Sequence, residues 1–452
     1  MDVIKKRPHT GSGYPSPAIG WITVLVLSLT YMFSFMDRQI LVLLVEPMKQ
    51  DLQISDTQVS LLTGFAFAAV YAVMGIPMGR AADLRVRKHV IIFGVTIWSV
   101  LTIYCGLALN FIQLFFARMG VGFGEAALTP TAYSMVADLF PPEKLSRAMS
   151  VFVLGGTAGA ALSLLFGGYV IGWVDQVGEI SLPLLGVVAA WQLVLIIVGF
   201  LSLLMVIPLS LIPEPARHNT CVKGSPEGET NLSFSEVLAY LWTQKRFYGF
   251  YIAGIALFNL YAYGGGAWLP SYFIRVHGWE ASSAGINLGL LYLVPALFGS
   301  LFAGWLSDRL FARGFSTASL SLMTIAVAML TVLIPLVIYI PSMPIKIVAM
   351  VLANLLVVIV AVLLPTVMQL ATPNRIRAQV SAIFLLVINL VGIGLGPTVI
   401  ALITDYGFQD DMAVGDSIAL VAVTCFLLAT ALLLAAHRPF QQRVNEVIYD
   451  KT

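Results

Sequence analysis

The stretch Tyr31-Met-Phe-Ser-Phe-Met-Asp-Arg-Gln-Ile-Leu-Val-Leu-Leu44 organises the chain, because it places two charges, Asp37 and Arg38, inside a long apolar run. The run extends from about residue 18 to residue 45, which is long enough to cross a bilayer as one helix. A charge in hydrocarbon costs at least roughly 2.5–3.5 kcal/mol, so such residues are usually paired and functional. A later apolar run holds a comparable set, Arg118 and Glu125. We therefore expect these four groups to form the centre of a membrane-embedded machine.

The composition defines the broad class of the protein. Of 452 residues, 59% are hydrophobic and 11% are charged, whereas soluble domains carry roughly 25% charged residues. This balance predicts a polytopic membrane protein. The net charge of +2 gives no reason to expect a nucleic-acid partner. The three cysteines show neither metal-ligand spacing nor a disulfide framework, so no metal site is expected from them.

Twelve apolar runs predict an all-α membrane protein with twelve transmembrane helices. A tight turn is expected between the third and fourth runs, because one helix through both would be far too long to span a bilayer. The predicted spans lie near residues 18–44, 56–79, 89–108, 111–138, 145–173, 184–211, 247–274, 282–306, 316–340, 345–371, 378–404 and 416–437.

The basic residues predict the orientation of these spans. Almost all lysines and arginines outside the apolar runs lie at the amino terminus, in the even-numbered loops or in the carboxyl tail. The odd-numbered loops carry only Lys49, Arg275 and Lys346. Since cytoplasmic loops are enriched in basic residues, both termini are expected in the cytoplasm. Short outer loops fit a multi-pass protein of a bacterial inner membrane.

The two halves of the chain repeat each other. Gly79-Arg-Ala-Ala-Asp83 follows the second span, and Gly304-Trp-Leu-Ser-Asp308 follows the eighth, about half a chain length later. Duplicated six-span units of this kind rock about a central site to give alternating access. The predicted divisions are a cytoplasmic tail at 1–17, a six-helix bundle at 18–212, a cytoplasmic linker at 213–245, a second bundle at 246–438 and a cytoplasmic tail at 439–452.

The linker combines two kinds of sequence. Residues 213–230 are rich in Pro, Gly, Glu and Lys, and we expect them to be flexible. Ser233-Phe-Ser-Glu236 is a capping-box pattern that predicts a short amphipathic helix. This helix would lie either on the membrane surface or against the underside of the bundle.

The loop motifs resemble those of the major facilitator superfamily. Gly79-Arg-Ala-Ala-Asp83-Leu-Arg85-Val-Arg87-Lys88 looks like its Gly-x-x-x-Asp-Arg-x-Gly-Arg-Arg/Lys signature, and Gly304-Trp-Leu-Ser-Asp308-Arg309 is the better match. The first copy departs from the signature at Leu84 and Val86. The resemblance covers essentially the whole chain and implies the major facilitator fold. It also implies that Asp83 and Asp308 act as gate latches with loop arginines; simple solvation of these loop ends is the alternative.

Within the superfamily, the chain is similar to the spinster group. Asp37-Arg38-Gln39 carries this likeness in the first span, and Arg118-x-x-x-Gly122-x-Gly124-Glu125-Ala126 carries it in the fourth. The resemblance implies export of lysophospholipids or sphingolipid-type molecules, with proton coupling. Organic-anion/proton symporters of the same superfamily also have an Asp-Arg pair in the first span, so that reading stays open.

The four intramembrane charges are the candidate chemistry. Asp37 is expected to couple protons, because apolar surroundings favour its protonated form and a nearby arginine favours its ionised form. The alternative is a permanent ion pair that locks spans 1 and 4. Adjacent helical residues point about 100° apart, so Arg38 must face elsewhere. Counting residues along the two spans places Asp37 near Arg118. Glu125 is then a second proton or substrate site.

The second half is predicted to carry no charge inside its spans. Its polar side chains, among them Asn259 and Tyr263 in the seventh span, are expected to form a hydrogen-bonding and apolar cavity wall. Ordinary packing is the alternative for each aromatic residue. Arg38 or Arg118 would then meet an anionic head, and the second half would take an apolar tail.

These inferences predict a transporter and not an enzyme. We expect a proton-coupled secondary transporter, with protons as the coupling ion and no cofactor, that moves an amphipathic lipid-like anion by alternating access. The alternatives are symport of small organic anions and multidrug efflux. A membrane-embedded lipid enzyme is disfavoured, because the sequence offers no metal-ligand cluster and no nucleophile elbow. Membrane lipids are the other expected partners, and a monomer is the expected state.

Overall fold

The computed structural model describes residues 14–140, 142–177, 180–182, 186–217, 234–373 and 376–449. Within these ranges, twelve helices are long and apolar enough to cross a membrane. They run over Pro17–Leu43, Asp56–Ala82, Arg87–Gly106, Phe111–Leu139, Arg147–Val174, Ala190–Leu211, Lys245–His277, Ala281–Ala312, Ala318–Tyr339, Met343–Ala371, Gln379–Phe408 and Asp411–Glu446. The predicted number and order of spans are confirmed, with ends that differ by several residues.

The amino-terminal half contains spans one to six. Its elements are α1 (Pro17–Leu43), α2 (Val45–Leu52), α3 (Asp56–Ser60), η1 (Leu61–Phe65), α4 (Ala66–Leu84), α5 (Arg87–Gly106), α6 (Phe111–Glu125), α7 (Leu128–Leu139), α8 (Pro142–Val177), β1 (Ile180–Leu182), β2 (Gly186–Val188), α9 (Ala190–Leu204) and α10 (Val206–Leu211). β2, paired antiparallel with β1, occupies the predicted start of the sixth span, so this span begins at Ala190.

The carboxyl-terminal half contains the other six spans, after a short surface helix. Its elements are α11 (Phe234–Thr243), α12 (Lys245–His277), α13 (Ala281–Ala312), α14 (Ala318–Tyr339), α15 (Met343–Ala371), α16 (Arg377–Asn389), η2 (Leu390–Leu395), α17 (Gly396–Leu402), η3 (Ile403–Phe408), η4 (Asp411–Ala413) and α18 (Val414–Tyr449). The predicted carboxyl tail continues α18 as a helix as far as Tyr449.

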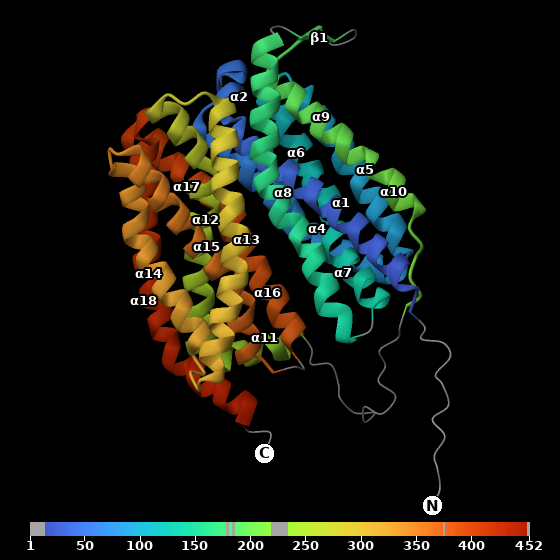
Figure 1. Cartoon of the computed structure of the whole chain (residues 1–452), viewed down its shortest axis with the longest axis vertical. Helices are drawn as coiled ribbons and strands as arrows, with labels where there is room; N and C mark the ends of the chain where they lie inside the picture. The colour runs from blue at the N-terminus through green and yellow to red at the C-terminus, as the bar shows by residue number, and fades with distance from the viewer. Residues whose placement is uncertain are drawn as a thin grey trace, which may run out of the picture.

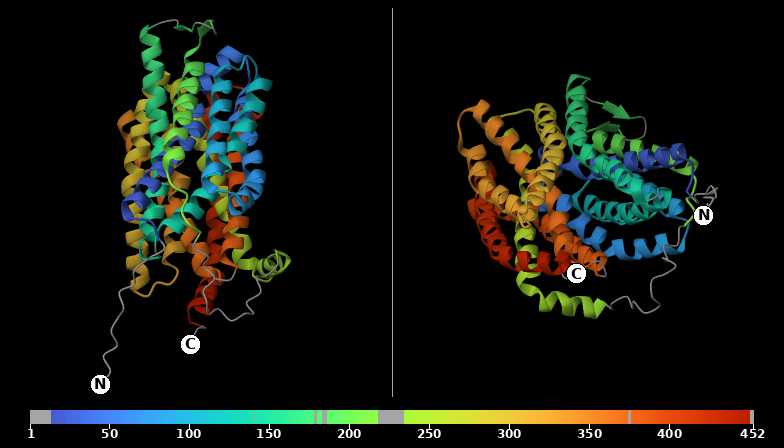
Figure 2. Two further views of the ribbon diagram at one scale, coloured as in Figure 1. Left: turned by 90° about the vertical axis from the view of Figure 1, so that its right-hand side faces the viewer. Right: turned by 60° about the horizontal axis from the view of Figure 1, so that its bottom comes forward.

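Each half is a bundle with its own packing, and the halves meet along a few helices. α1 packs on α8 and α5 on α9 in the first half, whereas α12 packs on α18 and α14 on α15 in the second. Contacts between the halves come mainly from α8 with α13, from α4 and η1 with η2, and from α3 and η1 with α17. Figure 1 shows the halves close together at the end that carries α2 and β1, while α8 and α13 diverge toward the end where both chain termini lie. Figure 2 shows the same two groups of helices from two further directions.

Small residues allow the first half to pack closely around α1. A Cβ atom at Gly155 would collide with the Ser28 carbonyl, and one at Gly159 would collide with the Met32 carbonyl. Small residues at such spacing let helix backbones approach within a membrane. These glycines of the fifth span therefore have a packing role. This contact fixes the face of α1 that carries Asp37 relative to α8.

Wide helical turns interrupt spans 2 and 11 where they face each other. The π-helical segments η1 and η2 contact one another across the boundary of the two halves. Gly64 of η1 lies against the carbonyls of Ile393 and Gly394 of η2. Such π-bulges occur frequently at functional sites. Here they lie at a boundary between the two bundles.

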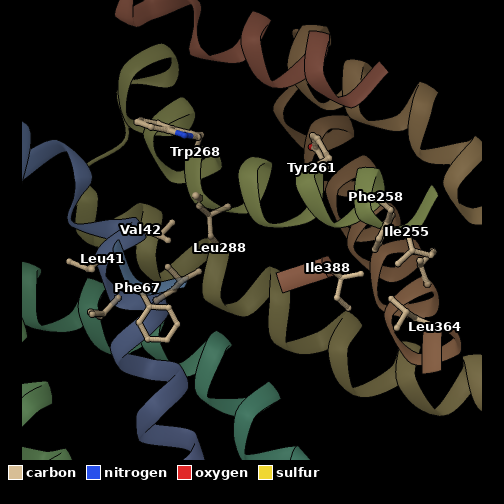
Figure 3. Packing of buried hydrophobic residues seen from close by; sticks show 14 of the residues in the cluster. Leu41, Val42, Phe67, Ile255, Phe258, Tyr261, Trp268, Leu288, Leu364 and Ile388 are labelled. Carbon is tan, nitrogen blue, oxygen red and sulfur yellow. The ribbon is translucent and has the colours of Figure 1, made fainter. Parts of the chain in front are cut away.

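Two buried aromatic residues of the second half donate their polar hydrogens to backbone carbonyls. Trp268 Nε1 donates to the Pro397 carbonyl at 2.9 Å, and the Tyr251 hydroxyl donates to the Leu364 carbonyl at 2.7 Å. A polar group without a partner costs several kcal/mol in hydrocarbon, so these bonds are expected of buried Trp and Tyr. Figure 3 shows Trp268, Tyr261 and Phe258 following one another along α12 within the apolar core.

Candidate functional site

Asp37 and Arg118 form a buried but loosely joined ion pair. Arg118 Nη1 lies 3.5 Å from Asp37 Oδ2, and the side chains are 1% and 0% exposed. Among the described residues, neither carboxylate oxygen of Asp37 and none of the three guanidinium nitrogens of Arg118 has a hydrogen-bond partner. The predicted approach of these two residues is confirmed. Their charges are therefore held together by proximity and not by a directed bond.

Arg38 and Glu125 form a much tighter pair. Arg38 Nε donates to Glu125 Oε2 at 2.5 Å, and the Ser34 hydroxyl donates to the same oxygen at 2.6 Å. The Arg38 guanidinium also lies over the rings of Phe35, Phe67 and Tyr71 at 4.6–5.0 Å from their centroids. Carboxylate and aromatic faces together stabilise a desolvated cation. Arg38 is thus fixed on both sides.

Helix geometry explains the two separate pairs. Asp37 and Arg38 are adjacent on α1 and point about 100° apart, so they cannot share one partner on α6. Arg118 and Glu125 lie seven residues apart on α6, which places both on one face at two different depths. Each acid of one helix therefore meets a base of the other. The four charges are consistent with the predicted site, assembled from spans 1 and 4.

Two adjoining cavities lie beside this cluster. The smaller, of about 50 Å³, has both arginines on its wall but neither of the two carboxylates. Its lining consists of Phe35, Arg38, Gln39, Val42, Thr63, Phe67, Arg118, Tyr263, Ala267, Ile393 and Pro397. The larger, of about 200 Å³, shares Gln39, Val42 and Tyr263 with it and extends into the second half. The cavity system is therefore cationic at one end.

The larger cavity has a mainly apolar wall. Residues of α12, α14 and α15 supply most of it, with a few polar groups such as Tyr261, Tyr292 and Asn354. Tyr263, predicted to bind substrate, lines both cavities. Asn259, predicted alongside it, donates instead to the Ile255 carbonyl at 2.9 Å and lines neither cavity. The cavity wall that the second half provides is thus mainly apolar with a few hydrogen-bonding groups, as predicted.

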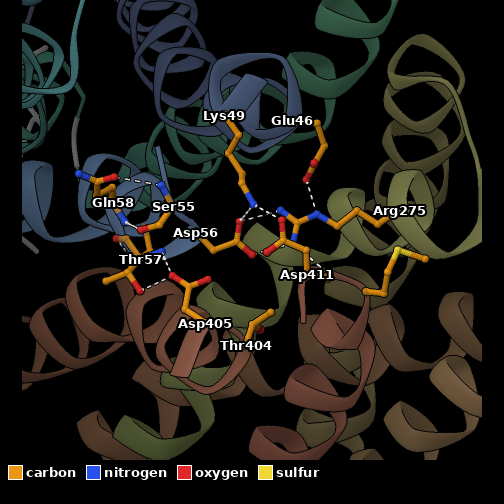
Figure 4. Close-up of polar contacts among 12 residues, drawn as sticks. Glu46, Lys49, Ser55, Asp56, Thr57, Gln58, Arg275, Thr404, Asp405 and Asp411 are labelled. Carbon is orange, nitrogen blue, oxygen red and sulfur yellow. Dashed lines mark hydrogen bonds and ion pairs between the residues drawn. The ribbon is translucent and has the colours of Figure 1, made fainter. Parts of the chain in front are cut away.

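A network of ion pairs joins the halves at the end that carries α2. Arg275, near the end of α12, donates to both oxygens of Asp56 at 2.6 and 2.7 Å and to Glu46 at 2.8 Å. Lys49 of α2 pairs with Asp56 at 2.6 Å and with Asp411 of η4 at 2.7 Å. Figure 4 shows Asp56 between the two cations. Because this end is the one predicted to face away from the cytoplasm, we call Glu46, Lys49, Asp56, Arg275 and Asp411 the outer network.

A second contact beside the outer network caps a helix of one half with a carboxylate of the other. Asp405 Oδ2 accepts from the backbone N–H of Thr57 at 2.8 Å and from its hydroxyl at 2.6 Å. Thr57 lies in the first turn of α3, where backbone N–H groups lack helical partners. Figure 4 shows this contact next to the Asp56 cluster. Carboxylate oxygens of Asp56, Asp405 and Asp411 lie within 4.8 Å of one another, and Lys49 and Arg275 offset the charges of two of them.

The prediction that the second half carries no charge in its spans is wrong. Arg275 lies in α12 and Lys346 lies in α15, and Lys346 is only 1% exposed. α12 continues beyond its apolar run as far as His277, so Arg275 becomes part of a span. Lys346 was counted among the loop residues, although the predicted span at 345–371 already includes it. The sequence did contain a signal: Lys49, Arg275 and Lys346 are the three basic residues on the side where few are expected. All three turn out to be engaged in contacts within the protein.

At the opposite end, Arg87 of the loop motif is built into the amino-terminal bundle. It is 1% exposed and donates to Glu214 at 2.9 Å and to the Pro215 carbonyl at 2.8 Å. It also pairs with Asp138 of α7. Arg217 adds a bond of 2.7 Å to the Ala82 carbonyl. Residues 213–217, predicted to belong to a flexible linker, are therefore fastened to the bundle.

The other motif residues are less engaged in the structure. Arg85 is exposed, and its backbone carbonyl accepts from Arg217 at 2.7 Å. Gly79 lies near the end of α4, and Gly304 of α13 has open space around it. Arg309 lies over the Trp305 ring at 5.2 Å. The side chains of Asp83 and Asp308 lie outside the described residues, and so do residues 218–233 of the linker and its Ser233 cap.

The short helix α11 combines both predicted placements. Val237 is buried, and the Tyr240 hydroxyl pairs with Arg443 of α18, so one face packs under the second bundle. Burial raises the pKa of Tyr240. On the other side, Leu238 and Trp242 are exposed, and Lys245 lies 4.8 Å from the Trp242 ring centre. An exposed Trp beside a cation is typical of a membrane–water interface.

Comparison with known proteins places this arrangement in a family. The model of the Major Facilitator Superfamily matches residues 27–397. The chain is 28% identical to an MFS-type efflux pump of Mycolicibacterium smegmatis, over 92% of this chain and 94% of that protein. It is 24% identical to Protein spinster of Drosophila melanogaster over 65% of this chain, and it spans 46% of that protein.

A solved structure shows the same fold with the same subfamily likeness. A bacterial homolog of the human lysosomal transporter Spinster, in an inward-facing and unoccupied conformation, superimposes with a TM-score of 0.78. The match covers 96% of this chain and 99% of that chain at 26% identity. The likeness therefore extends over the amino-terminal charges and both bundles.

Proposed function

This chain belongs to the major facilitator superfamily as a transporter of the spinster type, and we propose that it couples protons to the movement of an amphipathic, lipid-like anion. The substrate class is that of lysophospholipids or sphingolipid-type molecules, moved unchanged by alternating access. Protons are the coupling ion, and no cofactor takes part. The proposed setting is a bacterial inner membrane, with a monomer as the working unit and both termini in the cytoplasm.

The observation that carries the proposal is the polarity of the cavity wall. Arg38 and Arg118 line the smaller cavity, while their partners Glu125 and Asp37 lie behind them. A ligand in this cavity therefore meets guanidinium groups first. Arginine forks match phosphate and carboxylate groups well. This arrangement favours an anionic head group over a neutral or cationic one.

The adjoining cavity supports an apolar tail on the same substrate. It opens from the smaller one at Gln39, Val42 and Tyr263, and its wall in the second half is mostly aliphatic. Burying hydrocarbon there contributes roughly 0.8 kcal/mol per methylene group. A small hydrophilic anion would gain nothing from this wall. An amphipathic molecule uses both ends of the cavity system.

Charge balance gives a reason for proton coupling. Two carboxylates and two guanidiniums are neutral together when all four are ionised, so a bound monoanion leaves one uncompensated negative charge in a buried site. Uncompensated charge is costly in such surroundings, and one proton removes it. Asp37 is the proposed acceptor, because its pair with Arg118 has no directed hydrogen bond to break. Protonation would release Arg118 toward the anion.

Glu125 is the proposed second participant. Its oxygen Oε2 already accepts from Arg38 and Ser34, so a substrate anion must compete with it for Arg38. A proton on Glu125 would weaken that competition. Proton and anion then favour each other's binding, as linkage requires of two coupled ligands. The geometry therefore supports movement of proton and anion together.

Alternating access needs contacts that open and close on opposite sides. The outer network joins the two halves at one end, whereas Arg87 with Glu214 and Asp138 stays within the amino-terminal bundle at the other. We propose that the outer network is the gate that breaks when the cavity opens to the outside. Arg87 keeps the inner end of its bundle rigid while the halves rock.

Flux through the purified protein in proteoliposomes tests the proposal. A lysophospholipid and a small organic anion are each offered with and without an imposed pH gradient. Lysolipid flux that follows the gradient in the native protein, and loses this response in Asp37→Asn, is the expected result. Gradient-driven flux of only the small anion would contradict the substrate class. An unchanged pH response in Asp37→Asn would contradict the coupling role.

A second candidate function is efflux of amphipathic drugs. It is favoured by the 28% identity to the efflux pump of M. smegmatis over nearly the full length of both proteins. Ligand-induced thermal stabilisation over a panel of lysolipids, organic acids and cationic drugs distinguishes the two functions. Because the two cavity arginines repel cations, the proposed function predicts stabilisation by anionic lysolipids. Stabilisation by cationic drugs but not by anionic lysolipids would instead favour efflux.

A further inference from the structure

Lys346 is a buried cation that the proposed transport cycle does not use. It lies in the first turn of α15, is 1% exposed, and has no carboxylate partner among the described residues. A buried charge without an opposite charge is costly unless hydrogen bonds compensate it. Its surroundings therefore call for an explanation other than ion pairing.

Three acceptors surround the Lys346 ammonium. Nζ lies 2.5 Å from the Tyr272 hydroxyl oxygen, 2.8 Å from His277 Nε2 and 3.1 Å from the Ile338 carbonyl oxygen. The Tyr272 hydroxyl uses its own proton for the Ile338 carbonyl at 2.7 Å, so toward Lys346 it can only accept. An ammonium has three N–H donors and no acceptor. Every donor of Lys346 is satisfied only if His277 Nε2 carries a lone pair.

A charged Lys346 therefore favours a neutral His277 with its proton on Nδ1; the Tyr272 hydroxyl lies 3.1 Å from the same Nε2. Adding a proton would place two N–H donors, both carrying positive charge, face to face across 2.8 Å. Imidazoles ordinarily change charge between pH 5 and 8. Lys346 is the charged group that interacts electrostatically with His277. Asp416 of α18 and Tyr339 of α14 interact electrostatically with Tyr272. The Tyr339 hydroxyl donates a hydrogen bond to Asp416 at 2.8 Å.

The last turn of α12 connects this cluster to the outer network. Arg275 and His277 are two residues apart, so they point about 200° apart around the helix. Arg275 reaches Asp56 of the first half, whereas His277 reaches Lys346 of the second half. The turn ends at Gly278, whose φ of +64° suits a glycine, and the Trp279 N–H returns to the Phe273 carbonyl at 3.1 Å. The end of α12 is thus held from both sides.

We propose that Tyr272, His277 and Lys346 form a pH-sensitive positioning cluster for the outer network. When His277 is neutral, the cluster holds the last turn of α12 so that Arg275 reaches Asp56 and Glu46. When external acid protonates His277, the repulsion from Lys346 displaces that turn and weakens the Arg275 contacts. The outer side then opens more readily where protons are abundant. This inference rests on the proposed gate role of the outer network, but not on any particular substrate.

Distance measurements across the outer side test the cluster without substrate. Spin labels at Gln50→Cys and Ile345→Cys, both exposed in the structure, report the separation of the halves in lipid nanodiscs, with Cys221→Ser removing a third label site. We expect a longer-distance population that grows between pH 7.5 and 5.5. A single proton can change this population ratio by at most about tenfold per pH unit.

Three variants separate His277 from the carboxylates of the gate, which also titrate. His277→Gln keeps an acceptor but cannot be protonated, and it should lose the pH-dependent step that the native protein shows near neutrality. His277→Asn repeats the test with a shorter side chain. Lys346→Met removes the repelling charge and should reduce the same step. A full acid response in His277→Gln, or no acid response in the native protein, would overturn the proposal. Lysolipid flux, measured separately, reports on the proposed function.

Discussion

Asp56 of α3 accepts hydrogen bonds from both terminal nitrogens of Arg275 of α12, at 2.6 and 2.7 Å, and this bidentate contact joins the two halves of the molecule. Asp56 is fully buried, and Lys49 approaches it from its own half. Removing one member of such a buried pair typically costs about 3–5 kcal/mol. In the proposed cycle, the closed state of the outer side depends on this pair of hydrogen bonds.

Arg275→Gln should therefore shift the protein toward an outward-open state. Labelling of Gln39→Cys, a cavity position, by an impermeant maleimide added outside should rise by at least about tenfold, which needs only 1.4 kcal/mol. Asp411→Asn is the matched control, because the Asp411 side chain is 61% exposed and its pair with Lys49 should contribute little. Equal labelling of the native protein and Arg275→Gln would remove the gate assignment.

Asp37 and Arg118 should show strong thermodynamic coupling. Arg118→Gln leaves the Asp37 carboxylate buried without its cation, and the expected loss of stability is about 3–5 kcal/mol at neutral pH. The loss should shrink as pH falls, because a protonated Asp37 needs no counter-charge. The double variant Asp37→Asn/Arg118→Gln should recover much of the stability. Thermal unfolding in detergent at several pH values measures all four members of the cycle, and additive losses would argue against a functional pair.

Filling the apolar cavity should discriminate by chain length. Ala353 of α15 is buried and lines the larger cavity. Ala353→Phe should weaken binding of a long-chain lysolipid at least about tenfold, since several methylenes at roughly 0.8 kcal/mol each lose their site. A short-chain analogue with the same head should bind nearly as before. Binding assays over a chain-length series check this, and a uniform loss would place the tail elsewhere.

Arg87 should matter far more than its neighbour Arg85. Arg87→Ala removes the guanidinium from Glu214 and Asp138, and hydrogen bonds to charged groups contribute roughly 1.5–3 kcal/mol each. A lower unfolding temperature and easier proteolysis at the inner end of the bundle are expected. Arg85→Ala, from the same motif but exposed, should change little. Similar losses in both variants would indicate a general charge effect.

Some of the site follows from sequence because helices impose simple rules. Span length and charge placement predicted twelve helices, and counting residues along the spans predicted that Asp37 lies near Arg118. Counting could also show that Arg38 needs another partner. It could not show that this partner is Glu125, or that Ser34 donates to the same Glu125 oxygen. Depth along two antiparallel helices can be estimated from sequence. The choice of rotamer and partner depends on packing.

The outer network could not be predicted in the same way. Lys49 and Arg275 lie more than two hundred positions apart in the sequence, and their meeting at Asp56 depends on how two bundles dock. Lys346 was counted as a loop cation because it lies next to residue 345, the predicted start of its span, and hydropathy alone cannot show that its side chain is buried. Positive-inside counting marked these residues as exceptions without revealing their role.

The cap that Asp405 places on α3 links the transport cycle to hydration. When the halves separate, the Thr57 N–H and the Asp405 carboxylate both lose their partner and must be solvated by water. The same holds for the charges around Asp56. Opening of the outer side would thus hydrate polar groups that are buried or partly buried when it is closed. Solutes that are excluded from protein surfaces, such as sucrose, should oppose opening. A higher osmotic strength on the outer side should therefore favour the closed state of this transporter.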